Sequence, residues 1–201
     1  MVDASLQAET LARLARCIQF WQHQGFRFVE LPWLAPARYT DATKPAAVTS
    51  PDLATPYGNL LASGEQAFLM LLEEGRLGEG SHFIGWTPCF RDELQFDATH
   101  HFYFLKAELF VQIGALSQYE AEQQSMVQAA LSWFAQEAAL TGKPLSLELE
   151  QLSTMQVDIL GNGLEIGSYG LREFAGQLYV YGTACAEPRF SQALQVTPRQ
   201  A

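Results

Sequence analysis

The C-terminal part of the sequence constrains the fold most, because it contains four strand-like segments joined by short connections. The segments 145–152, 155–161, 163–170 and 177–184 are rich in apolar and β-branched or aromatic residues, and several alternate apolar with polar positions. Such segments are typical of strands, and short connections join antiparallel neighbours. The sequence therefore predicts a largely antiparallel sheet in this region.

Three earlier segments show the spacing of helices. Residues 5–25, 63–75 and 117–142 each begin at a serine, repeat apolar residues at helical spacing and end at a glycine. Serine is a favoured N-cap, and glycine is a favoured residue just after the last helical turn. We therefore expect three helices, each with its opening serine as N-cap.

The remaining segments complete an α+β pattern. Residues 26–34, 81–93 and 100–114 are predicted as strands, the first of them interrupted by Pro32. Residues 35–59 are predicted as a long loop, and a last helix is expected to start near Glu187–Pro188. Strands that arrive as hairpins, with helices between them, favour an α+β domain with a mostly antiparallel sheet. The chain has 201 residues, which is enough for one domain with a real core and too short for two ordinary ones.

Composition excludes several classes of function. The net charge is −10 and the 12 Lys and Arg residues are spread along the chain, which disfavours binding to a nucleic-acid backbone. The three cysteines form no C-x-x-C pair, so a disulfide scaffold or structural zinc site is not expected. We see no signal peptide and no apolar run of membrane-spanning length, so we expect a cytoplasmic protein that does not contact a membrane.

One segment, Cys89–Phe110, mixes side chains that an ordinary amphipathic strand does not need. It contains an arginine, several carboxylates, two adjacent histidines and several aromatic rings among apolar residues. Two interpretations are open: a polar hairpin at the surface, or the lining of a site for a charged, planar ligand. Taken alone, Arg91 with Glu93 is most simply a surface ion pair, and Phe104 is most simply a core residue.

Together with two other segments, this one forms an ordered pattern. The first segment, 19–34, is a predicted helix end, a glycine and a strand that reaches a proline. The second is Phe90–Glu93, followed by a histidine, a phenylalanine and a glutamate at four-residue steps from position 100. The third is 163–170, followed by a strand and an arginine before the last helix.

These segments resemble, in this order, the three signature motifs of the class II aminoacyl-tRNA synthetase catalytic core. The second motif is the most specific. Its Asp97–His100 is similar to the phenylalanyl α-type branch, and its ending "FLKAEL" is similar to the seryl branch. In the third motif Ala184 and Ala186 stand where the family has glycines, and Pro188 comes just before Arg189.

The resemblance implies a fold and a domain organisation. The fold would be a class II aminoacyl-tRNA synthetase-like core, in which a mostly antiparallel sheet is flanked by helices. The matches span about 19–194, so we expect residues 1–201 to form a single minimal catalytic-core-like domain. No anticodon-binding or tRNA-arm domain is recognised. In the family the 19–34 segment builds a dimer interface, which implies a homodimer here.

The resemblance also implies an ATP site. Arg91 and Arg189 would be the catalytic residues, binding the α- and γ-phosphates, because a planar guanidinium suits phosphate oxygens. Phe104 would stack on the adenine ring, and Glu93 would accept a hydrogen bond from its amino group. The implied ATP-binding residues are Arg91, Glu93, His100, Phe104, Glu165 and Arg189.

Magnesium and an amino acid complete the expected ligands. Mg²⁺ prefers one or two carboxylates together with phosphate oxygens, so Glu165 is its candidate ligand, with Glu108 or Asp158 as a second. The amino-acid pocket is expected to contain Glu65, Gln66, Trp86, Ser168 and Tyr169.

Glu65 also has a purely structural explanation, because a helix dipole favours an acidic residue near the start of a helix. His101 has no motif position, and because neighbours in a strand alternate faces, we expect it to point away from the site.

The leading hypothesis is an ATP-dependent enzyme that activates an amino acid, or a related carboxylate, as an acyl-adenylate. The acyl group would go to an acceptor other than tRNA, such as a carrier protein, a protein lysine, a small amine or ammonia. The alternative is a synthetase-like regulatory or accessory protein that is weakly active or inactive and binds an amino acid or a nucleotide. The departures at Ala184, Ala186 and Pro188 motivate it. Aminoacylation of tRNA is the least favoured reading, and the sequence does not identify the amino acid.

Overall fold

A curved seven-stranded sheet forms the centre of the molecule in the computed structural model, which describes residues 4–44, 52–92 and 101–196. Its strand order is β1-β5-β6-β10-β9-β8-β7, and every neighbouring pair is antiparallel except β1 with β5. The predicted α+β class with a mostly antiparallel sheet is therefore confirmed. The strands are β1 (Arg27–Phe28), β5 (His82–Phe90), β6 (Tyr103–Ile113), β7 (Leu147–Ser153), β8 (Gln156–Gly161), β9 (Leu164–Phe174) and β10 (Gln177–Glu187).

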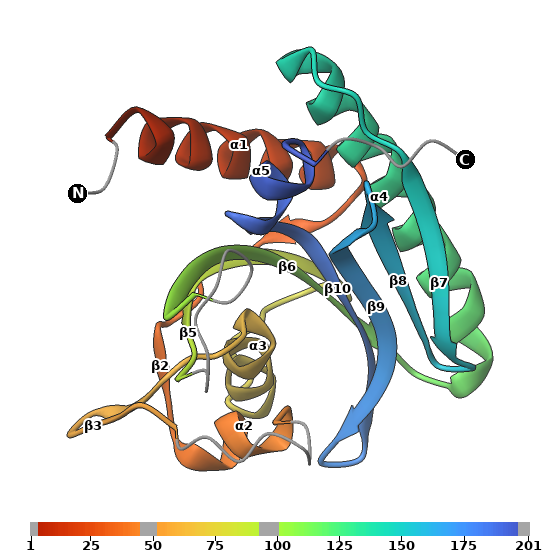
Figure 1. The fold of residues 1–201 in the computed structure, drawn as a ribbon. Helices are drawn as coiled ribbons and strands as arrows, with labels where there is room; N and C mark the ends of the chain where they lie inside the picture. Colours follow the sequence, from red (N-terminus) through yellow and green to blue (C-terminus); the bar gives the residue numbers. More distant parts are fainter. Residues whose placement is uncertain (1–3, 45–51, 93–100, 197–201) are drawn as a thin grey trace.

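Helices cover the convex face of this sheet (Figure 1). They are α1 (Ala4–His23), α4 (Tyr119–Thr141), which follows the short 3-10 helix η1 (Leu116–Gln118), and α5 (Arg189–Ala193). Apolar side chains of these helices, among them Trp21 and Phe134, pack on strand residues such as Ile159 and Val180. This is the larger hydrophobic core, and it fixes the convex face as a structural layer.

The concave face wraps around a second group of elements (Figure 1). A smaller core joins them to the sheet, and in it Phe110 of β6 stacks between Phe68 and Tyr179, with ring centroids 5.2 and 4.7 Å apart. The elements are β2 (Leu34–Ala35), α2 (Ala37–Ala42), β3 (Ala54–Thr55), β4 (Gly58–Leu60) and α3 (Gly64–Glu73).

Two predicted segments differ from the structure. The segment 35–59 is not a plain loop, because α2 and the small sheet β2-β4-β3 occupy its described part. The segment 26–34, predicted as a strand interrupted at Pro32, pairs with β5 over a shorter stretch than expected: Arg27 and Phe28 lie opposite β5, and the Val29 N–H donates to the Ile84 oxygen. The next strand, β2, begins at Leu34, beyond the proline, which lacks the N–H that a sheet ladder needs.

The predicted helix ends are confirmed more often than the starts. Gly25, Gly75 and Gly142 all have a positive φ just after a helix, which is the conformation that glycine adopts without strain. Ser63 caps α3 by accepting a hydrogen bond from the Glu65 N–H. Ser117 is not an N-cap, because η1 precedes α4 and contains it.

The first helix begins earlier than predicted. Helix α1 already includes Ala4, so Ser5 lies inside the helix and is not its cap. Among the helices in the described ranges, none combines the length and apolar character needed to cross a membrane.

Candidate functional site

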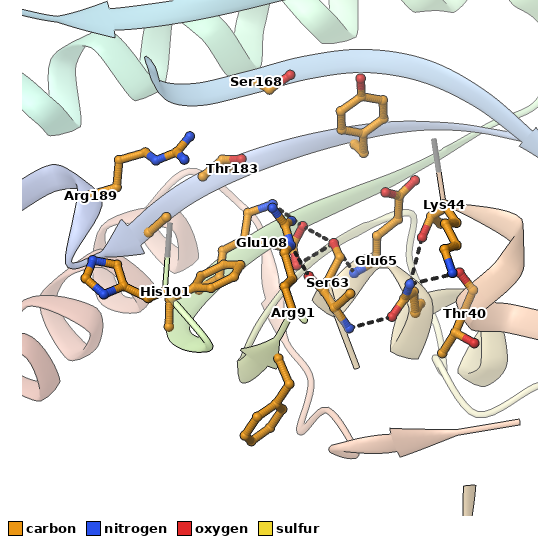
Figure 2. A pocket seen from close by; sticks show the side chains of 18 of the residues that line it. Thr40, Lys44, Ser63, Glu65, Arg91, His101, Glu108, Ser168, Thr183 and Arg189 are labelled. Atoms are coloured by element: carbon orange, nitrogen blue, oxygen red, sulfur yellow. Dashed lines mark hydrogen bonds and ion pairs between the residues drawn. The ribbon is translucent and has the colours of Figure 1, made fainter. Parts of the chain in front are cut away.

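A cavity of about 410 Å³ opens on the concave face of the sheet, a volume typical of small-molecule sites. Its walls come from α2, the start of α3, the end of β5, strands β6, β9 and β10, and the start of α5. Figure 2 shows Arg189 and His101 at one end and Thr40 and Lys44 at the other, with Glu65 between them. Segments far apart in the sequence thus meet around one space.

The end of β5 supplies a cation that covers an aromatic ring. The guanidinium carbon of Arg91 lies 4.8 Å from the centroid of the Phe104 ring, which is a cation–π contact. The Arg91 Nε also donates to the carbonyl oxygen of Ala62 at 3.2 Å. Because Arg91 is exposed, its remaining N–H groups can reach a ligand in the cavity. Arg91 and Phe104, each predicted for the ATP site, therefore lie in contact with one another.

A second cation stands at the start of α5. The Arg189 Nη1 donates to Glu165 Oε2 of β9 at 3.2 Å, and both residues line the cavity. Ala186 also lines the cavity, whereas Ala184 is fully buried in the convex-face core. Of these two alanines, Ala186 is the one that borders the cavity.

Glu108 of β6 sits against the N-terminus of α3. It is 3% exposed and accepts hydrogen bonds from Ser63 Oγ at 2.7 Å, from the Gly64 N–H and from Lys106 Nζ at 2.6 Å. A Cβ on Gly64 would lie 2.8 Å from Glu108 Oε2, so a side chain at this position would displace the Glu108 carboxylate.

The hydrogen-bond donors around Glu108 lower its pKa. Burial alone would raise its pKa, but the charge of Lys106 and the hydrogen bonds from Ser63 and Gly64 outweigh it. The pKa of Glu108 therefore lies below its ordinary value, and the group is ionised at neutral pH.

Glu65, in the first turn of α3, is held differently. It is 5% exposed, and it accepts from the Tyr179 hydroxyl at 2.7 Å and from Arg172 Nη1 at 2.6 Å. Burial raises its pKa, and Arg172 and Tyr179 offset only part of that effect. Glu65 lines the cavity as predicted, but with both oxygens already receiving donors from this chain.

Gln66 closes the far end of the cavity. Its Oε1 accepts from the Ala62 N–H at 2.9 Å, and its Nε2 donates to the Thr40 oxygen at 3.1 Å and to Thr43 Oγ1 at 3.0 Å. These bonds tie α2 to α3. Gln66 borders the cavity as predicted, and in this structure it shapes the wall.

Two predicted pocket residues lie on the wrong face. Ser168 of β9 lines the cavity, but its neighbour Tyr169 is fully buried in the convex-face core and donates its hydroxyl to the Thr183 oxygen at 2.6 Å. Trp86 of β5 also packs against the convex-face core. Because neighbours in a strand point to opposite faces, Ser168 and Tyr169 could not both line one cavity.

His101 was expected to point away from the site, and this expectation was wrong. This histidine lies before β6 begins at Tyr103, so strand alternation does not apply, and it lines the cavity beside Gln192 at 3.1 Å. Glu93 and His100 lie outside the described residues. Sequence reasoning missed Lys106, although it stands two positions before Glu108, where strand alternation places it on the same face.

The carboxylates fit a single-carboxylate Mg²⁺ site better than a cage. Glu165 is partly exposed and faces the cavity. Glu108 is saturated by its three donors, and Asp158 is buried and does not line the cavity. In the part of the chain that the structure describes, no three His, Cys, Asp or Glu residues gather as metal ligands. Glu165 with phosphate oxygens matches the coordination that Mg²⁺ prefers.

No protein-family model and no curated relative matches the sequence. Solved structures do. A pyrrolysyl-tRNA synthetase from Desulfitobacterium hafniense superimposes with a TM-score of 0.68 at 17% identity, over 94% of this chain and 70% of that one. The cytoplasmic serine-tRNA ligase from Naegleria fowleri, in complex with AMP, gives 0.73 at 16% identity, over 100% of this chain and 56% of that one.

A third structure agrees. Seryl-tRNA synthetase from Pyrococcus horikoshii, complexed with ATP, gives a TM-score of 0.66 at 17% identity, over 92% of this chain and 49% of that one. At these identities the likeness establishes the fold. The chain has the fold of a class II aminoacyl-tRNA synthetase catalytic core.

Proposed function

We propose that this protein activates the carboxylate of an amino acid, or of a related acid, with ATP. The product would be an acyl-adenylate, and pyrophosphate would be released. One observation carries the proposal: a single cavity is lined both by two arginines, Arg91 and Arg189, and by two buried carboxylates, Glu65 in the first turn of α3 and Glu108 of β6 against it. That arrangement suits a nucleotide phosphate beside a substrate ammonium group. The likeness to synthetases solved with AMP and ATP supports it.

The chemistry needs positioning and charge neutralisation more than covalent help from the protein. An oxygen of the substrate carboxylate attacks the α-phosphorus, and the bond from that phosphorus to the pyrophosphate oxygen breaks. Both reacting groups are anionic, so Arg91 would bind the α-phosphate and Arg189 the γ-phosphate. Phe104 would stack on adenine. Glu93 and His100 keep the ATP-binding roles that the motif resemblance implies.

The substrate would lie between β9 and the start of α3. Glu65, paired with Arg172, and Glu108, paired with Lys106, are the carboxylates there, and a substrate ammonium group would share them with those cations. Gln66 and Ser168 would shape the same pocket. Mg²⁺ would be held by Glu165 together with phosphate oxygens, and it would supply charge neutralisation to the triphosphate.

The acceptor and the oligomer are further parts of the proposal. A net charge of −10 opposes binding of a tRNA backbone, so a carrier protein, a protein lysine, a small amine or ammonia is the proposed acceptor.

The segment 19–34 exposes Phe28 and Trp33, the latter to 55%. Exposed aromatic side chains of this size support a homodimer contact at this segment. Analytical ultracentrifugation tests it: the Trp33→Ser variant should contain a larger fraction of monomer than the unmodified protein.

Pyrophosphate exchange tests the proposed function directly. The protein is incubated with ATP, labelled pyrophosphate, Mg²⁺ and each of the twenty amino acids in turn. The expected result is label in ATP that depends on one amino acid or a few similar ones. If no amino acid supports exchange at high protein concentration, the activation chemistry is wrong.

A second candidate is a protein that binds an amino acid or a nucleotide without reaction. Ala186 favours it, because its methyl group borders the nucleotide end of the cavity where the family has glycine. The ion pair between Arg189 and Glu165 favours it as well, since ATP would have to compete for that arginine. Calorimetric titration with Mg-ATP separates the candidates: saturable binding without exchange supports the second.

A further inference from the structure

Arg172 of β9 is a cavity cation that the activation chemistry does not use. Its Nη1 donates to Glu65 Oε2 at 2.6 Å, and its guanidinium carbon lies 4.4 Å from the centroid of the Tyr181 ring. About a third of the side chain, 35%, is exposed, and it lines the cavity. An ion pair and a ring contact therefore fix the orientation of a guanidinium at the cavity wall.

Most hydrogen-bonding capacity of Arg172 remains unused. A guanidinium carries five N–H donors in a planar fork. Within the described ranges, Glu65 is the one hydrogen-bond acceptor that Arg172 contacts. Glu65 also receives the Tyr179 hydroxyl, so it is not dependent on Arg172 alone. A cation held rigidly beside a cavity, with donors to spare, is suited to a planar anion such as a carboxylate.

The two arginines reach the start of α3 from opposite ends of the sheet. The backbone N–H of Arg91 donates to the Phe102 carbonyl oxygen, just before β6 begins. Arg172 of β9 lies opposite Tyr179 of β10, which in turn lies opposite Gln112, near the other end of β6. Their side chains converge, because Arg91 donates to Ala62 and Arg172 donates to Glu65.

Carboxylates lie between these two cations. Glu65 and Glu108 both stand at the start of α3, and both border the cavity. From Arg91 to Arg172 the wall presents a cation, then two carboxylates, and then the Arg172 cation; of the carboxylates, Glu108 is in an ion pair with Lys106, and Glu65 is in an ion pair with Arg172 itself. A ligand with the opposite order, negative, positive and negative, would be complementary to it.

We propose that the substrate carries a second anionic group in its side chain and that Arg172 binds this group, so that the substrate is an amino dicarboxylic acid of the size of aspartate or glutamate. The inference rests on the proposed function. The reacting carboxylate would face Arg91, the ammonium group Glu65 and Glu108, and the side-chain carboxylate Arg172. Ser168 and Gln156, which are joined by a 3.1 Å hydrogen bond, supply polar neighbours on the same wall.

A ligand panel on the unmodified protein tests the inference first. Calorimetry in the presence of Mg-ATP compares aspartate with asparagine and glutamate with glutamine, because each amide matches its acid in shape and lacks the charge. Serine and lysine complete the panel. One of the acids is expected to bind about 10- to 100-fold more tightly than its amide, the range for a charged hydrogen-bonding partner in a desolvated site. Equal binding, or tighter binding of a neutral or basic amino acid, overturns the inference.

Pyrophosphate exchange with the same panel separates the two proposals. Exchange that depends on a neutral or basic amino acid supports activation and overturns the role of Arg172. Tight binding of an acid without exchange supports the role of Arg172 and overturns activation.

A charge-balanced variant separates recognition from structural support. Arg172→Gln combined with Glu65→Gln removes both charges of the pair, so that no buried carboxylate is left alone, and Glu65→Gln alone retains Arg172. We expect the preference of acid over amide to fall to near one in the double variant and to persist in the single variant. A purely structural Arg172 would lower the melting temperature and leave that ratio unchanged.

Two further variants complete the set. Arg172→Lys keeps the charge but loses the planar fork, so it should retain part of the preference. Arg76→Gln, which removes an exposed arginine paired with Glu74, serves as the matched control and should leave the ratio unaltered. A preference that is the same in Arg172→Lys, the double variant and the unmodified protein would overturn the inference.

Discussion

Two clusters of charged side chains differ in how completely their charges are paired: a buried cluster on the convex side of the sheet, of which Glu187 also borders the cavity, and a partly exposed cluster around the cavity itself. On the convex side, Arg13 of α1 donates to Glu137 of α4 and to Glu187 at the end of β10, and Arg16 also donates to Glu137. Arg13, Glu137 and Glu187 are each at most 3% exposed. On the concave side, Arg91, Arg172 and Glu165 border a cavity and remain partly exposed.

We infer from this difference that the convex cluster holds the structure together and that the concave cluster is available to a ligand. Every charge of the convex cluster faces an opposite charge, so the network ties α1 and α4 to the strand that leads into α5. In the concave cluster Arg91 has no carboxylate partner among the described residues, and Arg172 keeps donors to spare. Substitutions in the first cluster should therefore change stability, and substitutions in the second should change chemistry.

Arg91→Ala should have the largest effect. It removes the cation expected at the α-phosphate, and loss of one preorganised charge-stabilising group typically costs a factor of about 1,000 in rate. Pyrophosphate exchange should fall by at least about that factor, while the urea midpoint should stay close to that of the unmodified protein. Retention of most of the exchange rate would show that Arg91 does not touch the nucleotide.

Arg13→Met should have the next largest effect, and on stability. The substitution leaves Glu187 and Glu137 buried with fewer donors, and breaking a buried ion pair from one side costs about 3–5 kcal/mol. Urea unfolding measures this free energy. Arg76→Met, in an exposed pair with Glu74, is the control and should unfold like the unmodified protein. Equal behaviour of the two variants would mean that the convex network does not stabilise the fold.

Glu108→Gln should have a smaller, pH-dependent effect. The pKa of Glu108 is lowered from 4.5, so its ionised form stabilises the fold at higher pH, and this contribution is lost as pH falls through the lowered pKa. The variant should be about 1–3 kcal/mol less stable at pH 7, and the difference should shrink below pH 4.5. Unfolding at a series of pH values measures it.

Glu65→Gln is the control, because its effect on stability should change with pH in the opposite direction to that of Glu108→Gln. The pKa of Glu65 is raised, so its contribution is greatest at low pH and is lost as pH rises through the raised pKa. The stability of Glu65→Gln relative to the unmodified protein should therefore improve as pH rises. Parallel pH curves for the two variants would contradict the assigned environments.

The sequence predicts the fold well where local signals agree. Glycine stops, the Ser63 cap and the paired C-terminal strands were all readable, because turn chemistry and strand patterns act locally. The residues 35–59 were not, because α2 is only six residues long and is stabilised by packing of Tyr39 and by contacts to α3. Tertiary contacts decide such short elements, and single-sequence patterns do not contain them.

Motif spacing predicted which residues line the cavity better than it predicted which face of a strand each residue occupies. The motif spacing found Arg91, Phe104 and Glu108, which the structure brings together. It did not find Arg172, because its role depends on pairing with Glu65, which is 107 positions away. Strand alternation, applied to Ser168 and Tyr169, would have excluded the latter in advance.

His101→Ala should have the smallest effect on exchange, and it tests the edge of the concave cluster. His101 lines the cavity near Arg189 but lies beside Gln192 at 3.1 Å, and it carries no motif position. We expect a loss of less than about 10-fold, the size of one modest hydrogen bond, against the 1,000-fold loss for Arg91→Ala. His82→Ala, in a convex-side pair with Glu122, is the matched control and should leave exchange unaltered. If His101→Ala matched Arg91→Ala, the histidine would be in direct contact with the nucleotide phosphates, and the ligand-binding cluster would extend to this end of the cavity.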